Sequence, residues 1–388
     1  MVSRLLMHVG PSVGNYNVLS ASTVPNIGFA SPEFNSAMDY CLRQYLNITG
    51  ADESYSPFII PGGGTAAMES TMSFLKKGSK VLVVSNGVFG DRWEKILSRY
   101  PVEFKVLRAS AGNSVPVSQV KAEVQDEHYD AVTLTHVETS TGVRIPLKEM
   151  ASAIRPFVNL IFVDGVASIG GERINASDWN IDVCLTASQK ALGAQTGAGL
   201  LSVSERAIAA MQENSITGYF LDLRNWLPIM KSFLDGKGGY FATPPVGTIF
   251  SLQRSFELIE SETAEQRFER HRICSEGFRR GVREMGLEIV ASEGVRSNTV
   301  SGVYIETGKV TDFLKQSMAR GVEFAAGVHE QIRDRYFRVG HMGWIEPSHI
   351  IKALHVIEES SISVGIQVNK GAAEIAAKGI FEKSPVTL

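Results

Sequence analysis

Short apolar runs alternate with longer stretches of helical periodicity between about residue 56 and residue 204. The apolar runs are rich in β-branched residues and lie at residues 56–60, 80–85, 104–108, 131–136, 160–164, 182–187 and 199–204. Most are continuously apolar rather than alternating, a pattern typical of strands that are covered on both faces. Helical patterns lie between them, for example at residues 64–77 and 146–157. This alternation predicts an α/β fold built on a mainly parallel, seven-stranded sheet.

The pattern changes after residue 205. Residues 218–245 are aromatic, glycine-rich and irregular, and one long helical pattern then starts near Thr248 and continues into a strongly charged stretch. Short strands and helices follow it. We therefore expect a large α/β domain at residues 21–250 and a smaller C-terminal α+β domain at residues 251–388, connected by the long helix.

The composition fits a two-domain protein with a sizeable core, because 44% of the 388 residues are hydrophobic. The formal net charge is −3 and the sequence has no dense stripe of Lys and Arg, which argues against a nucleic-acid surface. No apolar run approaches the ~18 residues of a membrane span, and neither terminus carries a recognisable targeting or lipidation signal. We therefore expect a soluble, cytoplasmic protein.

The three cysteines, Cys41, Cys184 and Cys274, lie far apart and form no CxxC pair. This spacing fits a reducing compartment and argues against a disulfide framework or a zinc site, so no metal site is expected. Cys184 falls inside a predicted strand and the other two within helical patterns, so we expect buried, inert thiols.

Residues with useful chemistry follow five of the predicted strands, at the sheet edge where ligands bind in open α/β folds. In chain order they are three glycines with Thr65, then Phe89, the hydroxyl side chains of residues 139–141, Asp164 and Lys190. Taken singly, each has an ordinary structural explanation, such as a glycine-rich turn, a core aromatic residue, a cap or a solvated charge.

Together these residues match what pyridoxal phosphate requires of a protein. A glycine loop at a helix start can hold the phosphate, and an aromatic side chain can lie over the ring. A lysine amine forms an imine with the aldehyde, and a carboxylate keeps the pyridinium nitrogen protonated so that the ring can accept electrons. The combination, rather than any single residue, indicates this cofactor.

The sequence also resembles the class V, fold-type I aminotransferases of the alanine–glyoxylate and serine–pyruvate group. The resemblance rests on the stretches HVGPSVGNYNVL, FASPEFNSAM, PGGGTAAME, SNGVFGDRW, HVETSTGVRIPL, FVDGVASIGG, SQKALGAQTGAGLLSVSERA and YFRVGHMG. It implies a homodimeric, pyridoxal phosphate-dependent transaminase with a ping-pong mechanism. It also implies that the substrates are a small L-amino acid, alanine or serine, and a 2-oxo acid, glyoxylate or pyruvate.

The resemblance gives the matching residues their expected roles. Lys190 is expected to hold the cofactor as a Schiff base and to move the Cα proton, while Asp164 pairs with the pyridinium nitrogen. Arg338 is expected to bind the substrate carboxylate through two parallel hydrogen bonds.

Further contacts follow from the same resemblance. Residues 1–20 would close over the active site, with Gly10 and Pro11 lining the pocket. The cofactor contacts implied within one chain are Gly63, Gly64, Thr65, Phe89, Thr139, Val166 and Gln189. A partner chain would supply Tyr240 and Thr243, which would make residues 218–245 an interface segment.

The sequence departs from the family pattern near the cofactor. Gln195 and Thr196 stand where many members have Pro-Pro, Gly63 stands where many have serine, and Phe89 replaces a tryptophan. We expect these changes to affect substrate preference more than cofactor binding, since either aromatic ring can stack.

Other functions are alternatives. A cysteine desulfurase-like lyase usually has a histidine before the lysine, where this chain has Gln189. A non-catalytic relative would have lost Lys190 or Asp164, and a dinucleotide-binding protein would need GxGxxG in place of PGGGTAAME. An aspartate or broad-specificity aminotransferase would need one more cation near the pocket. The candidates are Arg92, Arg144, Arg173 and Arg224.

Overall fold

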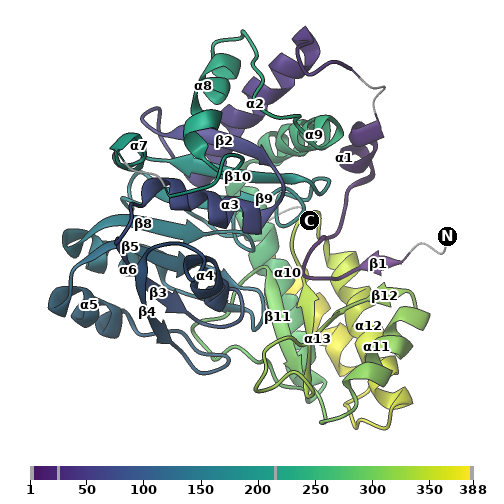
Figure 1. Cartoon of the computed structure of the whole chain (residues 1–388). Helices are drawn as coiled ribbons and strands as arrows, with labels where there is room; N and C mark the ends of the chain where they lie inside the picture. The colour runs from purple at the N-terminus through teal and green to yellow at the C-terminus, as the bar shows by residue number, and fades with distance from the viewer. Residues whose placement is uncertain (1–3, 24–26, 214–215, 385–388) are drawn as a thin grey trace.

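A seven-stranded sheet forms the centre of the larger part of the molecule (Figure 1). The computed structural model describes residues 4–23, 27–213 and 216–384. The strands of this sheet are β2 (Ser56–Pro61), β3 (Lys80–Ser85), β4 (Glu103–Arg108), β5 (Tyr129–Thr135), β8 (Val158–Asp164), β9 (Val183–Ala187) and β10 (Ala198–Val203). Their spatial order is β2-β10-β9-β8-β5-β3-β4, and only β10 runs antiparallel to its neighbours. The predicted fold class is confirmed, and the bounds of each predicted strand agree within two residues.

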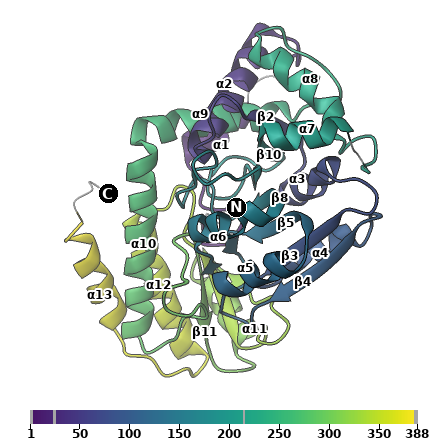
Figure 2. The same ribbon diagram turned by 90° about the vertical axis from the view of Figure 1, so that its left-hand side faces the viewer.

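Helices cover both faces of this sheet. The helices α5 (Val117–Asp126) and α6 (Leu147–Ile154) pack together on one face, and α3 (Gly64–Ser70) and α4 (Gly90–Leu97) lie on the other (Figures 1 and 2). The connections through α3 and α4 move along the sheet toward β4, and those through α5 and α6 move back toward β8. Because crossovers between parallel strands are right-handed, the two pairs of helices must lie on opposite faces of the sheet. The helices α2 (Pro32–Thr49), α8 (Leu223–Leu234) and α9 (Val246–Glu262) pack together next to β2, and α7 (Glu205–Glu213) follows β10.

The single long helix expected from Thr248 onward is wrong. The structure has two helices, α9 and α10 (Ala264–Glu284), which meet at Thr263 and run in different directions (Figure 2). Thr263 has a φ of 68°, and its hydroxyl accepts a hydrogen bond from the backbone N–H of Gln266 at 3.3 Å. A threonine followed three residues later by a glutamine is a helix-start signal, which the continuous helical periodicity obscured.

The C-terminal part is built on a smaller antiparallel sheet of β11 (Val300–Tyr304), β14 (Tyr336–Gly340) and β13 (Ala325–Ala326), with β14 in the middle. The helices α10, α11 (Val310–Ala319), α12 (Pro347–Ser363) and α13 (Ala372–Phe381) pack beside it. The N-terminal strand β1 (Leu5–Leu6) pairs in parallel with β12 (Val322–Glu323) of this part. The start of the described chain therefore lies on the C-terminal part.

Two main apolar cores fill these parts. The larger contains buried side chains from Val18 to Ile259, and the smaller combines Met7 and Val13 with residues between Cys274 and Ala377. The division of the chain at residues 20 and 250 stays a prediction.

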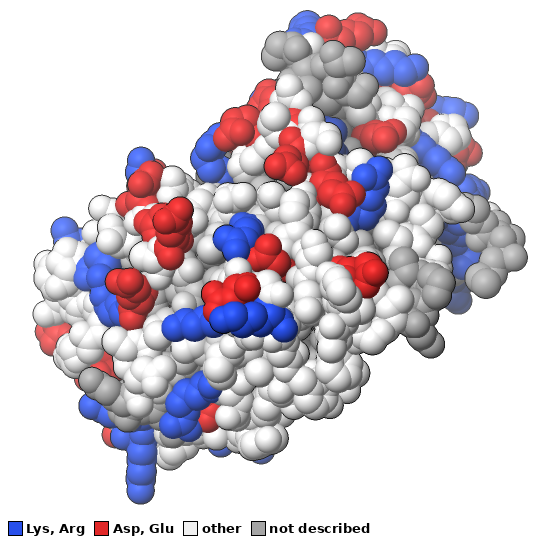
Figure 3. All heavy atoms as spheres, turned by 90° about the horizontal axis from the view of Figure 1, so that it is seen from above, with Lys and Arg blue, Asp and Glu red and all other residues white. Residues whose placement is uncertain are grey.

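The surface in Figure 3 is mixed in charge, and the three thiols are buried. The face seen in Figure 3 carries interspersed acidic and basic side chains over a largely uncharged surface. Within the described ranges, no helix has the length and apolar character that spanning a membrane demands. Cys41, Cys184 and Cys274 are free and buried, as predicted.

Candidate active site

The carboxyl ends of β8 and β9 bring Asp164 and Lys190 to the same edge of the sheet. Asp164 is the last residue of β8 and lies in register with Leu185 of β9, and the chain reaches Lys190 shortly after β9 ends. Because the two strands are parallel neighbours, their carboxyl ends must meet at this edge. The charges of the two side chains act on each other, since each shifts the pKa of the other toward its ionised form.

The N-terminal segment lies directly on Lys190. The Lys190 Nζ donates a hydrogen bond to the carbonyl oxygen of Val9 at 2.5 Å. Gly10 has a φ of 135°, and a Cβ at this position would lie 2.4 Å from Lys190 Nζ. Ser12 completes the contact, since its hydroxyl donates to the Lys190 carbonyl at 2.7 Å and its N–H to the Gln189 carbonyl at 3.0 Å. A side chain at position 10 would therefore displace the end of the Lys190 side chain from this position.

Burial sets the protonation of the lysine. The pKa of Lys190 is lowered to about 8, first by desolvation and then by the Arg338 and Arg92 guanidinium groups, against the opposing effect of the Asp164 carboxylate. A lysine amine with such a pKa is partly neutral near neutral pH, so it can accept a proton.

Asp164 is a buried carboxyl group at the strand end. Its pKa is raised to about 7, mainly by burial and also by the nearby Glu138 carboxylate. The backbone N–H of Val166, at 2.9 Å, and the cations Arg92 and Lys190 oppose this shift. A further positive charge against this carboxyl would stabilise its ionised form.

A tightly packed glycine loop follows β2. Gly64 begins α3, and a Cβ on it would lie 2.6 Å from a methyl group of Val166. The side-chain oxygen of Gln189 is buried and has no hydrogen-bond partner among the described residues, and the amide nitrogen of the same side chain lies 4.0 Å from where a Cβ on Gly63 would be. Gly63, rather than Thr65, occupies the N-cap position of α3, so Thr65 is free of the capping role that its sequence position also allowed.

Phe89 stands at the start of α4 and is held by a buried carboxylate that the sequence analysis did not single out. Glu138 is fully buried and accepts the backbone N–H groups of Phe89 at 3.1 Å and Gly90 at 3.0 Å. It also accepts the N–H and the hydroxyl of Ser140 at 2.9 and 2.6 Å. An acidic residue directly before the hydroxyl cluster at a strand end was the available signal.

Arg92 joins Phe89 to the glycine loop. Its guanidinium lies 4.6 Å from the centre of the Phe89 ring and donates to the Thr65 hydroxyl at 3.0 Å. The other three cations considered from the sequence form ion pairs instead: Arg144 with Glu172, Arg173 with Glu265, and Arg224 with Asp222.

Arg338 reaches this group of residues from the C-terminal part. It lies on the central strand β14, and its Nε donates to the carbonyl oxygen of Ala326 at 2.8 Å. One Nη donates to the carbonyl of Thr139 at 3.3 Å, which joins the small sheet to the residues that follow β5. Burial lowers the pKa of Arg338, while the Tyr336 and Glu138 side chains raise it.

Two predicted site residues lie on an exposed segment instead. Tyr240 is 54% exposed, stacks on Phe29 with ring centres 4.6 Å apart, and has its hydroxyl 3.4 Å from that of Thr243. Both residues belong to the irregular stretch between α8 and α9. The structure thus groups the predicted residues of one chain and leaves Tyr240 and Thr243 at the surface.

Comparison with known proteins places this arrangement in a family. Residues 16–342 match the sequence model of the class V aminotransferases. The chain is 36% identical to alanine–glyoxylate aminotransferase 1 of Saccharomyces cerevisiae over 87% of its own length and 91% of that protein. It is also 31% identical to an uncharacterized aminotransferase of Methanocaldococcus jannaschii, covering 98% and 99% of the two chains. The chain belongs to the class V aminotransferases.

Solved structures agree with this assignment. The crystal structure of ureidoglycine–glyoxylate aminotransferase from Bacillus subtilis has a TM-score of 0.90 at 24% identity over 98% of both chains. An alanine–glyoxylate aminotransferase from Nostoc has a TM-score of 0.87 at 26% identity, covering 93% of this chain and 96% of that one. The predicted fold type, family and transaminase class are therefore confirmed, and the family implies pyridoxal phosphate as cofactor.

The residues present fit that cofactor. Gly63 presents a side-chain-free surface beside the Gln189 amide nitrogen, Gly64 begins a helix, and the buried carboxyl of Asp164 accepts the Val166 N–H. A phosphate ester would accept from the Gln189 amide nitrogen and from the backbone N–H groups at the helix start, and a protonated ring nitrogen would donate to the Asp164 carboxylate.

Proposed function

We propose that this chain is a pyridoxal phosphate-dependent aminotransferase that moves an amino group from alanine or serine to glyoxylate or pyruvate. The observation that carries the proposal is the meeting of Lys190, Asp164 and Arg338 at one sheet edge, with the pKa of the lysine lowered to about 8. Alanine–glyoxylate aminotransferase 1 of S. cerevisiae and serine–glyoxylate aminotransferase of Methylorubrum extorquens, 27% identical, support the choice of substrates.

The chain's own side chains would do the following work. Lys190 would bind the cofactor aldehyde and, as a neutral amine, accept and return the Cα proton. Asp164, ionised by the adjacent positive charge, would keep the ring nitrogen protonated. When bound, pyridoxal phosphate supplies an electron sink for the electrons left at Cα and stores the amino group between the two half-reactions of a ping-pong cycle. Arg338 would hold the substrate carboxylate in two parallel hydrogen bonds.

The remaining residues would position cofactor and substrate. The backbone of Gly63 and Gly64, with Thr65 and Gln189, would hold the phosphate. Phe89 and Val166 would enclose the ring from opposite faces, with Thr139 near the ring hydroxyl. Gly10 and Pro11 would cover the substrate, because the adjacent Val9 carbonyl already lies on Lys190.

We also propose a homodimer in the cytoplasm. Tyr219 and Tyr240 are 78% and 54% exposed, and large apolar side chains at the surface mark contact areas. In a dimer, Tyr240 and Thr243 would complete the phosphate site of the partner chain. The three free thiols support a reducing compartment.

An aspartate donor is a second candidate. Arg92 is the only one of the four cations considered from the sequence that contacts a predicted site residue in the described chain. A cation there suits a donor with a second carboxylate. An L-aspartate–glyoxylate aminotransferase of Paracoccus denitrificans, 26% identical over 97% of this chain, supports this candidate.

The visible absorption spectrum of the purified protein with pyridoxal phosphate tests the proposal. We expect a cofactor band that L-alanine or L-serine converts and that Lys190→Ala abolishes. Conversion by L-aspartate alone, lost in Arg92→Gln, would select the second candidate. A protein that shows no such band with added cofactor contradicts both.

A further inference from the structure

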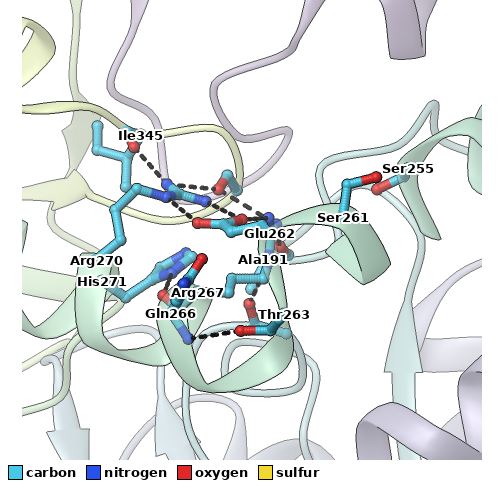
Figure 4. A network of polar contacts seen from close by, with 12 residues as sticks. Ala191, Ser255, Ser261, Glu262, Thr263, Gln266, Arg267, Arg270, His271 and Ile345 are labelled. Atoms are coloured by element: carbon cyan, nitrogen blue, oxygen red, sulfur yellow. Dashed lines mark hydrogen bonds and ion pairs between the residues drawn. The ribbon is translucent and has the colours of Figure 1, made fainter. Parts of the chain in front are cut away.

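A buried arginine near the start of α10 contacts the loops on which the site residues lie. Arg267 is fully buried, and its guanidinium stacks 4.5 Å above the ring of Trp344. Its Nε donates to the carbonyl of Gly170 at 2.8 Å, and one Nη donates to the carbonyls of Ala191 at 2.7 Å and Gly343 at 3.3 Å. Figure 4 shows the guanidinium between Ala191 and Glu262. One side chain therefore satisfies three buried backbone acceptors.

Each of these carbonyls belongs to a loop that carries a proposed site residue or follows the strand of one. Gly170 lies in the loop that follows Asp164, Ala191 is bonded directly to Lys190, and Gly343 lies just beyond the strand of Arg338. The loops come from both apolar cores, so Arg267 connects the large and small parts of the molecule. A planar group with five N–H donors in fixed directions suits this task, whereas an ammonium group has only three.

The bend at Thr263 places the carboxylate of Glu262 against the guanidinium of Arg267. Glu262 is the last residue of α9, and its carboxylate accepts from Arg267 at 3.1 Å and from Arg270 at 3.0 Å (Figure 4). Burial and the neighbouring Arg270 lower the pKa of Arg267, and Glu262 opposes both effects. A single helix in place of α9 and α10 would not fold the carboxylate back onto the two guanidinium groups.

We propose that Arg267 is a positioning residue for transamination. It holds the loop of Lys190 and the loops that follow the strands of Asp164 and Arg338 in one fixed arrangement. The inference rests on the proposed function, because the geometry matters only if those three side chains act on one substrate. Displacement of a reacting group by about 1 Å can lower a rate a hundredfold, so a residue that sets this alignment acts on turnover.

Arg270 provides a matched control. It is also buried, pairs with the same Glu262, and donates to the carbonyl of Ile345 and, at 3.5 Å, to that of Gly343, which Arg267 also contacts. It makes no hydrogen bond to Gly170 or Ala191 among the described contacts. Both Arg270→Lys and Arg267→Lys therefore disturb the ion pair with Glu262. Only Arg267→Lys also removes the hydrogen bonds to the carbonyls of Gly170 and Ala191.

The experiment compares the two variants with the wild type in two measurements. In the cofactor-free chain, Arg267→Lys is expected to speed hydrogen exchange in residues 188–196 and 165–172, and Arg270→Lys only near residues 341–346. In the loaded enzyme, Arg267→Lys is expected to lower kcat by at least about tenfold at a thermal midpoint similar to that of Arg270→Lys, whose kcat changes less than about threefold.

Every outcome decides the proposal. Equal exchange in residues 188–196 for both variants, or an unchanged kcat in Arg267→Lys, overturns the positioning role while the proposed function stands. If Arg267→Lys does not fold, Glu262→Gln replaces it and, because Glu262 pairs with both arginines, is expected to speed exchange in residues 188–196 and 165–172 as well as near residues 341–346. Unchanged exchange in the first two segments then overturns the positioning role. A wild type that takes up no cofactor and transfers no amino group removes the proposed function, whereas the exchange comparison still reports on the hold by Arg267.

Discussion

At the scale of single residues, the properties of the candidate site come from burial and from charged side chains that are distant in the sequence but close in the fold. Lys190 and Asp164 could be nominated from the sequence, because strand-end position and neighbouring motifs both point to them. Glu138 stood before a hydroxyl cluster at a strand end, but the backbone groups of residues 89 and 90 that it accepts are distant in the chain. Arg267 could not be nominated at all, because its significance depends on distant partners and on complete burial. No local pattern distinguishes such a residue from a solvated charge.

The lowered pKa of Lys190 predicts how cofactor capture depends on pH. The neutral amine reacts, so the rate of capture by the cofactor-free chain should be high above about pH 8 and fall as the pH drops through that value. Arg338→Gln removes a cation that lowers this pKa, so the midpoint should move upward. Stopped-flow absorbance measures the rate, with Arg173→Gln as control because Arg173 pairs with Glu265 at the surface. A midpoint that stays in place in Arg338→Gln contradicts the electrostatic explanation.

Glu138→Gln tests the carboxylate under Phe89. The carboxylate receives only donors, and an amide would turn its own N–H₂ toward one of them. We expect a loss of about 1–3 kcal/mol in the free energy of unfolding, together with reduced cofactor affinity. Denaturant unfolding and cofactor titration measure the two effects. The exposed Glu149→Gln should stay within about 0.5 kcal/mol of the wild type, and equal behaviour of the two variants would refute the role assigned to Glu138.

At the scale of elements, one face of α9 holds the loop after Lys190. The Thr248 hydroxyl donates to the Thr196 carbonyl at 2.9 Å, and the Ser251 hydroxyl accepts the N–H of Gln195 at 2.9 Å. The Ser255 hydroxyl donates to the Leu192 carbonyl. Hydroxyl residues three and four positions apart share a helix face, so the spacing was visible in the sequence. The loop to which these hydroxyl groups bind could not be recognised from the sequence, because that loop has no periodicity of its own.

The hydrogen bond between Gln195 and Ser251 gives a physical meaning to the departure from Pro-Pro. A proline at position 195 has no N–H to donate. Ser251→Ala should therefore lower the free energy of unfolding by about 1 kcal/mol in the wild type and by less in a Gln195→Pro background. A double-mutant cycle by denaturant unfolding gives the coupling. A coupling energy of zero would mean that this hydrogen bond does not stabilise the loop.

At the scale of the whole molecule, the large sheet was predictable and the joining of the two parts was not. Strands buried on both faces have a distinctive continuous apolar pattern, which survives without any knowledge of their neighbours. The bend at Thr263 and the return of β1 to β12 depend on which surfaces meet in three dimensions. Sequence periodicity contains no information about that choice.

Subunit mixing tests the proposed dimer. If Tyr240 and Thr243 act in the partner's site, mixing Lys190→Ala chains with chains carrying Tyr240→Ala and Thr243→Ala should restore up to about a quarter of the wild-type activity, because half of the dimers regain one intact site. Mixing Lys190→Ala with Arg338→Gln should restore nothing, since the structure brings these two residues together within one chain. Activity after unfolding and refolding of the mixtures is the measurement. Equal results for the two mixtures would contradict a shared site.

The placement of the N-terminal segment also fixes an order of events during synthesis. Leu5 pairs with Val322, and the Gly340 N–H donates to the Met7 carbonyl at 2.8 Å, while Val9 covers Lys190. The first described residues therefore find their strand partners only after β12 and β14 have been synthesised. Until then the large sheet can fold with its lysine uncovered, since domains generally fold as units during translation. The segment that covers Lys190 is thus synthesised before the large sheet but reaches its place after that sheet.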